Sequence, residues 1–153
     1  MRTIVKTGAA SVAAAVVGAL GTDPESRWYR GLEKPPYQPP GPAFGAVWTP
    51  LYGLFAYGTA RLLDAEPDPA RRRRLAALAG ADLAVNAGWC WAFFRVRRPS
   101  TSVAVIVVLD ALNLALLLAA ARRETRAAVV LSPYVAWCAF ATVLNADIAV
   151  RNR

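Results

Sequence analysis

The fold is decided by the stretch TSVAVIVVLDALNLALLLAAA at residues 101–121, in which Asp110 is the only charged side chain. A bilayer core of about 30 Å is crossed by about 20 apolar residues in a helix. Four further stretches have a similar length and character, with short charged connectors between them. We therefore predict an all-α protein, a five-helix transmembrane bundle that forms one integral membrane domain over residues 1–153. The expected spans are residues 4–20, 44–63, 75–94, 101–121 and 127–150.

Composition supports a membrane protein. Apolar residues make up 56% of the chain and charged residues 18%, against about 45–50% and about 25% in soluble domains. The net charge of +8 does not indicate nucleic acid as a partner, because the arginines cluster at the ends of the spans, where they meet lipid headgroups or set topology. Ten Lys and Arg residues fall on the side of the N-terminus and eight on the other, which favours an N-terminus on the inner side.

The first apolar run has two interpretations. Arg2 and Lys6 precede an alanine-rich stretch at residues 8–20, which fits either a first membrane helix or a cleaved signal peptide. The sequence does not identify which membrane holds the protein.

The first connection, GTDPESRWYRGLEKPPYQPPGPA at residues 21–43, is the longest. Its prolines restrict the backbone, and its aromatic residues distinguish it from a flexible linker. We expect an ordered proline-rich cap over the bundle, with an aromatic belt at the membrane interface as the alternative.

Aromatic residues follow helical spacing in the second span. Phe44, Trp48, Tyr52 and Phe55 share one face. Such a face usually packs in a core, but it could also line a pocket for a flat ligand. In the fifth span, a similar stripe runs along Trp137, Ala141, Leu144 and Ile148.

The third span has two contrasting faces. Asp82, Asn86 and Trp89 lie on the face expected to turn inward, because polar groups avoid lipid. Small residues recur on the opposite face and predict a homodimer seam; the alternative is packing on a neighbouring helix of the same chain. The predicted dimer interface consists of Ala76, Gly80, Ala84 and Gly88.

Candidates for chemistry are few. Asp82 and Asp110 lie inside spans and Asp147 near the end of one; each is a functional candidate or a hydrogen-bonded packing residue. Cys90 and Cys138 read as small hydrophobic residues. The chain has no histidine, no metal-binding cluster and none of the common catalytic or nucleotide-binding motifs. We therefore expect no metal site and favour binding, transport or sensing over catalysis.

Four segments together resemble the family of tryptophan-rich sensory and translocator proteins (TspO/MBR, the peripheral-type benzodiazepine receptor family). They are WYRGLEKP at 28–35, FGAVWTPLY at 44–52, LAVNAGWCWAFF at 83–94 and PYVAWCAFATVLN at 133–145. The resemblance implies a tight, usually dimeric bundle with a cavity under the first connection. It also implies binding of porphyrins such as protoporphyrin IX or haem, and in some members of sterols. The positions that match the family's ligand site are Trp28, Lys34, Pro40, Phe44, Trp48, Tyr52, Asn86, Trp89, Trp137 and Ala141.

Three positions depart from the family pattern. Asp82 stands where the family often has Gln, and Tyr37 stands where the first connection often has Trp. Asn145 is not followed by the tyrosine of the C-terminal sterol pattern, which puts sterol binding through that motif in doubt.

The favoured function is a membrane binding and sensory protein for porphyrins, with membrane lipid and a second copy of the chain as further partners. No cofactor is obligatory. Arg27, Arg30 and Lys34 are the nearest candidates to meet porphyrin propionates. The alternatives are a transporter of tetrapyrroles or sterol-like lipids, a light-dependent porphyrin-degrading enzyme that uses Trp48 and Trp137, and a scaffold with a filled core. Without histidine as an axial ligand, we expect metal-free porphyrin to bind at least as well as haem.

Overall fold

A computed structural model describes residues 2–153, and these residues form six helices and no strand. The all-α prediction is confirmed for these residues. The structure has one helix more than the five that were expected. The additional helix, α2, is a single short element in the first connection, and the other five are long. Their bounds are α1 (Arg2–Gly21), α2 (Arg27–Gly31), α3 (Gly41–Ala65), α4 (Pro69–Phe94), α5 (Pro99–Arg123) and α6 (Thr125–Arg151).

Local capping lets α4 begin before its apolar run. Asp68 caps α4, because its Oδ1 accepts a hydrogen bond from the N–H of Ala70 at 2.9 Å, and Pro69 occupies the first helical turn. This cap is a favourable start for a helix, since it satisfies one of the free N–H groups there. As a result α4 begins six residues before the expected start of the span, and residues 71–74 are helical.

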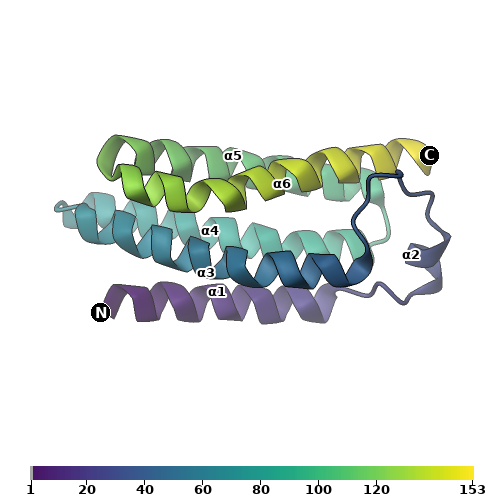
Figure 1. The fold of residues 1–153 in the computed structure, drawn as a ribbon, viewed down its shortest axis with the longest axis horizontal. Coiled ribbons are helices and arrows are strands. Elements are labelled where there is room, and N and C mark those ends of the chain that lie inside the picture. The colour runs from purple at the N-terminus through teal and green to yellow at the C-terminus, as the bar shows by residue number, and fades with distance from the viewer. Residues whose placement is uncertain (1) are drawn as a thin grey trace.

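The five long helices run along the long axis of the molecule (Figure 1). Their contacts give a ring in the order α1, α3, α6, α5, α4, which closes where α4 packs on α1. The short helix α2 lies beyond one end of the ring, in the connection from α1 to α3 (Figure 1). α1 thus packs against both α3 and α4 as part of the bundle.

The interior of the ring is closely packed away from α2. Phe55 and Tyr134 are fully buried there, with ring centroids 4.7 Å apart. Gly58 lets α3 approach α6, since a Cβ atom at this position would lie 2.7 Å from Leu131 Cγ. A second apolar cluster, around Phe93 and Leu144, lies toward the α2 end.

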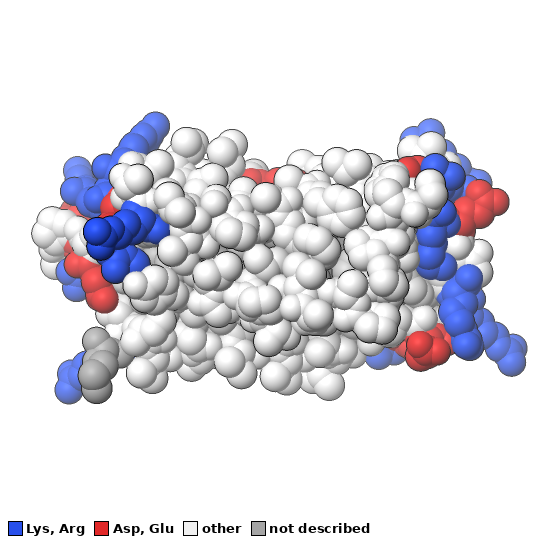
Figure 2. Space-filling view, viewed as in Figure 1, with Lys and Arg blue, Asp and Glu red and all other residues white. Residues whose placement is uncertain are grey.

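The surface is that of a membrane protein. Charged side chains gather at the two ends of the bundle and leave between them a broad, mostly apolar belt, in which one small acidic patch is visible (Figure 2). In the described part of the chain, α1, α5 and α6 are long and apolar enough to cross a membrane. α3 and α4 have the necessary length, but α4 begins with four arginines and encloses Asp82.

Candidate ligand-binding pocket

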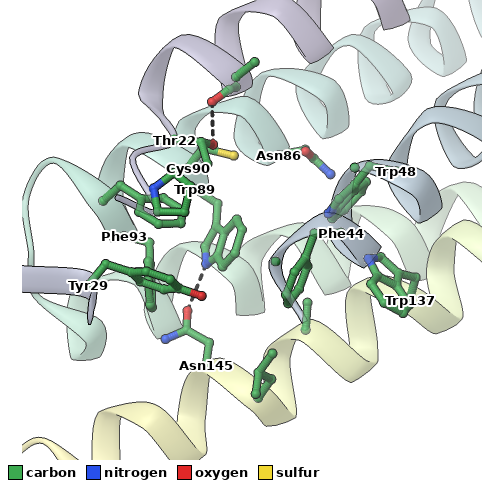
Figure 3. Close-up of a pocket in the computed structure, with 18 of the residues that line it drawn as sticks. Thr22, Tyr29, Phe44, Trp48, Asn86, Trp89, Cys90, Phe93, Trp137 and Asn145 are labelled. Atoms are coloured by element: carbon green, nitrogen blue, oxygen red, sulfur yellow. Dashed lines mark hydrogen bonds between the residues drawn. The ribbon is translucent and has the colours of Figure 1, made fainter. Parts of the chain in front are cut away.

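A cavity of about 380 Å³ lies at the α2 end of the bundle. Side chains of α1, α3, α4 and α6 form its walls, and the connection at residues 22–40 contributes Tyr29 and Gln38. Most of the lining is aromatic or aliphatic (Figure 3). A largely apolar cavity with a few polar groups is the usual form of a small-molecule site.

The aromatic face of α3 provides one wall. Phe44, Trp48 and Tyr52 line the cavity, as helical spacing allows. The centroids of Trp48 and Tyr52 are 5.6 Å apart, and Phe44 meets Trp137 of α6 edge to face at 6.2 Å. The fourth aromatic residue of this face, Phe55, packs in the filled interior instead. The first three residues of this aromatic face therefore form a pocket wall, whereas the fourth packs in the core.

A chain of hydrogen bonds runs from the pocket into the core. The Tyr52 hydroxyl donates to Asn86 Oδ1, the Asn86 amide donates to the Tyr134 hydroxyl, and that hydroxyl donates to Asp82 Oδ1, each at 2.8 Å. Tyr52 and Asn86 line the cavity, whereas Asp82 is fully buried beneath it. Asp82 and Asn86 face the interior, as expected. The burial and hydrogen bond of Asp82 fit the second alternative given above, a hydrogen-bonded packing residue.

The two indoles on opposite walls differ in their hydrogen bonding. The N–H of Trp89 donates to Asn145 Oδ1 at 2.9 Å (Figure 3), and the Asn145 amide donates to the carbonyl of Pro99 at 3.1 Å. These bonds fix the orientation of the Trp89 ring. The N–H of Trp137 is buried and has no partner among residues 2–153.

The first connection is anchored near the pocket. The Gln38 amide donates to the Tyr29 hydroxyl at 3.1 Å, while Gln38 Oε1 is buried without a partner in the described structure. Burial raises the pKa of Tyr29, and the hydrogen bond from Gln38 opposes this rise. The Tyr37 hydroxyl donates to Asp147 Oδ2 at 2.8 Å, and this hydrogen bond raises the pKa of Tyr37. Both tyrosines thus stay protonated at neutral pH and can donate hydrogen bonds.

Seven of the ten predicted ligand-binding residues line the cavity. They are Phe44, Trp48, Tyr52, Asn86, Trp89, Trp137 and Ala141. The three others lie in the connection between α1 and α3 and do not line the cavity. Trp28 packs against Phe93 with centroids 5.6 Å apart, and Lys34 donates to the carbonyl of Tyr29 at 2.6 Å. Pro40 occupies the N-cap position of α3 without a side-chain hydrogen bond.

Sequence reasoning missed the contribution of α1 and of Cys90. Ala15, Gly18 and Ala19 present only small groups to the cavity, which leaves it room. A Cβ atom at Gly18 would lie 3.4 Å from the sulfur of Cys90, so the sulfur of Cys90 lies close against α1. The repeated small residues of α1 were the available signal, but small residues indicate helix packing and cavity walls equally well.

The small-residue stripe of α4 is not buried in the ring. All four of its members, Ala76, Gly80, Ala84 and Gly88, are exposed. A Cβ atom added at Gly80 or Gly88 would meet nothing within 4 Å. Ala76 and Gly80 also border a recess that residues of α1 and α3 line from the other side.

These features define a helical membrane protein with an aromatic ligand-type pocket beneath its first connection. The chain belongs to the TspO/MBR family, whose family model matches residues 7–151. It is 35% identical to a tryptophan-rich sensory protein of Cereibacter sphaeroides, over 90% of this chain and 83% of that protein. It is 30% identical to the tryptophan-rich protein TspO of Archaeoglobus fulgidus, over 97% of this chain and 98% of that protein. It is 33% identical to the translocator protein of Homo sapiens, over 78% of this chain and 71% of that protein. The chain is therefore a membrane protein of the sensory and translocator class.

Proposed function

We propose that this protein crosses the membrane five times, with its N-terminus on the inner side, and binds porphyrins such as protoporphyrin IX in the aromatic pocket. The unpartnered N–H of Trp137, in a pocket walled by Trp48, Phe44 and Trp89, is the observation that carries this proposal. The faces of these rings offer the stacking and edge contacts that a large planar macrocycle requires.

Two polar groups in the pocket lining have unused hydrogen-bonding capacity. A buried donor or acceptor without a partner costs about 1–3 kcal/mol, and Trp137 Nε1 and Gln38 Oε1 both lack partners within residues 2–153. A ligand that supplies an acceptor near the indole and a donor near Gln38 would remove this cost. A free-base porphyrin has both, since its unprotonated ring nitrogens accept hydrogen bonds and its pyrrole N–H groups donate them.

The charged edge of a porphyrin has candidate partners beside the first connection. Arg27 and Arg30 are exposed on α2, and Arg30 forms an exposed 3.7 Å ion pair with Glu25. Arginine suits carboxylates because its guanidinium can bind both oxygens. We assign the propionates to this edge, with residues 22–40 acting as an ordered cap over the ring.

Titration of tryptophan fluorescence with protoporphyrin IX in detergent tests this proposal. We expect saturable quenching, with an affinity about fivefold weaker in Trp137→Phe, which keeps the ring but loses a hydrogen bond of about 1 kcal/mol. Trp91→Phe is the matched control, because Trp91 is 42% exposed and its N–H donates to Val17 outside the cavity. Absence of saturation, or an equal loss in Trp91→Phe, would refute the assignment.

A light-dependent degradation of the bound porphyrin is the second candidate. It is favoured by the placement of Trp48 and Trp137 on adjoining walls of one cavity. Illumination of the complex should then consume porphyrin in the wild type and not in Trp48→Phe or Trp137→Phe at saturating ligand. Binding without consumption leaves a sensory function, and porphyrin flux into proteoliposomes would identify a transporter.

We also propose a homodimer through the α4 stripe. Two such helices can approach closely, because Gly80 and Gly88 are exposed and face open space. Light scattering in detergent should show a dimer for the wild type and a monomer for Gly80→Leu/Gly88→Leu. Gly53→Leu is the control, since Gly53 is an exposed, uncrowded glycine on α3. A monomeric wild type, or a dimer in the double variant, would contradict this interface.

A further inference from the structure

A second recess lies at the end of the bundle opposite α2. It is formed between the start of α4 and the end of α5, near the α3–α4 connection, and has a volume of about 460 Å³. Its charged lining consists of Arg71, Arg74, Arg122, Arg123 and Glu66. We call these residues, with the apolar Leu75 and Ala119 that complete the lining, the basic recess.

The basic recess carries more positive charge than its own acids neutralise. Glu66 is 3% exposed, and its carboxylate pairs with Arg123 at 2.9 Å. Arg71 is 3.5 Å from Asp68 in an exposed pair, which contributes little. Arg74 and Arg122 have no ion pair or hydrogen bond to any residue in the range 2–153. Two guanidinium groups in the same recess are therefore available to an anion.

Helix electrostatics do not account for all of these arginines. Arg122 and Arg123 lie in the last turn of α5, where the helix dipole favours cations. Arg71 and Arg74 lie in the first two turns of α4, where the dipole disfavours them. A bound anion would offset both this unfavourable position and the repulsion among the four guanidinium groups.

The position of the recess identifies the source of the anion. Leu75 and Ala119 continue its lining on the side of the mostly apolar belt, and the charged band at this end of the molecule meets that belt directly (Figure 2). This is the depth at which lipid phosphates lie next to their acyl chains. A lipid fits both parts of the lining, whereas free phosphate fits only the arginines.

We infer that the basic recess binds the headgroup phosphate of an anionic phospholipid, held by Arg74 and Arg122. Arginine binds phosphate oxygens in pairs, and basic recesses between membrane helices suit anionic headgroups. The acyl chains then run from Leu75 and Ala119 over the outer surfaces of α4 and α5 toward the centre of the belt. This site is independent of the aromatic pocket at the other end of the bundle.

Native mass spectrometry of the full chain in detergent, with added phosphatidylglycerol or phosphatidylcholine of the same acyl chains, tests the inference. We expect the wild type to bind phosphatidylglycerol at least about fivefold more tightly than phosphatidylcholine, equivalent to about 1 kcal/mol. Arg74→Gln/Arg122→Gln should remove this preference. Arg97→Gln/Arg98→Gln is the matched control, since it removes two exposed arginines from the α4–α5 connection at the other end.

The outcomes separate a site from general charge attraction. Equal binding of the two lipids, or an equal loss in the control variant, would overturn the inference. Displacement of phosphatidylglycerol by inorganic phosphate at equal concentration would assign the recess to a free anion and overturn the lipid assignment. Unchanged helical circular dichroism and protoporphyrin quenching would show that Arg74→Gln/Arg122→Gln is folded, so that its loss of lipid preference supports the site.

Discussion

Replacement of Tyr134 by phenylalanine tests whether the hydrogen-bonded chain below the pocket holds α4 to α6. The hydroxyl of Tyr134 is fully buried, donates to Asp82 Oδ1 and accepts from the Asn86 amide, both at 2.8 Å. Phenylalanine preserves the ring and its packing on Phe55, whose centroid is 4.7 Å away. The substitution therefore removes two hydrogen bonds between helices and leaves the shape of the core almost unchanged.

The expected loss follows from these two bonds. Hydrogen bonds between membrane helices contribute about 0.6 kcal/mol on average and up to about 1.7 kcal/mol. Asp82 and Asn86 would each keep a buried polar atom without a partner, which places the loss toward the upper part of that range. The second oxygen of Asp82 already lacks a partner within residues 2–153. We expect Tyr134→Phe to lower the free energy of unfolding by about 2–3 kcal/mol.

The assay is unfolding by dodecyl sulfate in mild detergent, followed by helical circular dichroism. Tyr57→Phe is the control, because Tyr57 lies on the same bundle but is 48% exposed and accepts only a 3.3 Å bond from Arg61. Its loss should stay below about 0.5 kcal/mol. A Tyr134→Phe protein as stable as Tyr57→Phe would show that the buried chain does not stabilise the bundle.

Two further predictions concern packing and charge. Gly58→Ala should lower the free energy of unfolding by about 1–3 kcal/mol, because its Cβ would lie 2.7 Å from Leu131 Cγ. Gly53→Ala, on the open face of α3, is the control and should not lower it. Equal thermal stability of the two variants would contradict the close approach of α3 to α6. The Arg61 guanidinium holds the pKa of Glu124 below its ordinary value, so this pair stabilises the fold fully above the unfolded-state pKa of about 4.3 and less as pH falls through the folded-state pKa. The melting temperature should therefore fall less steeply below pH 5 in Glu124→Gln than in the wild type, and parallel profiles would refute this linkage.

The inward faces of the long helices were predictable from single-helix geometry. Phe44, Trp48 and Tyr52 recur at helical spacing, so one orientation of α3 turns all three inward. The cost of polar groups in lipid similarly predicted that Asp82 and Asn86 would avoid the outer surface. Each of these inferences needs only the period of a helix and the apolar nature of its surroundings.

The partners of these side chains were not predictable in the same way. Trp89 donates to Asn145, which is 56 positions away in the chain, and no periodicity within either helix relates the two. α2 was missed because its five residues are too few to show a period. Its N-terminus is capped by Ser26, whose hydroxyl accepts from the N–H of Tyr29 at 3.3 Å.

By itself the sequence determined that the protein is a helical membrane protein, since runs of about 20 apolar residues have no other stable solution in a bilayer. It also determined which side of each helix carries rings, polar groups or small residues. The tertiary structure alone decided where that interior is filled and where it is hollow. Phe55 packs against Tyr134 while Trp48, on the same face, lines a cavity, because the space beside a side chain depends on the depth and size of residues on the facing helices, such as Gly18 of α1.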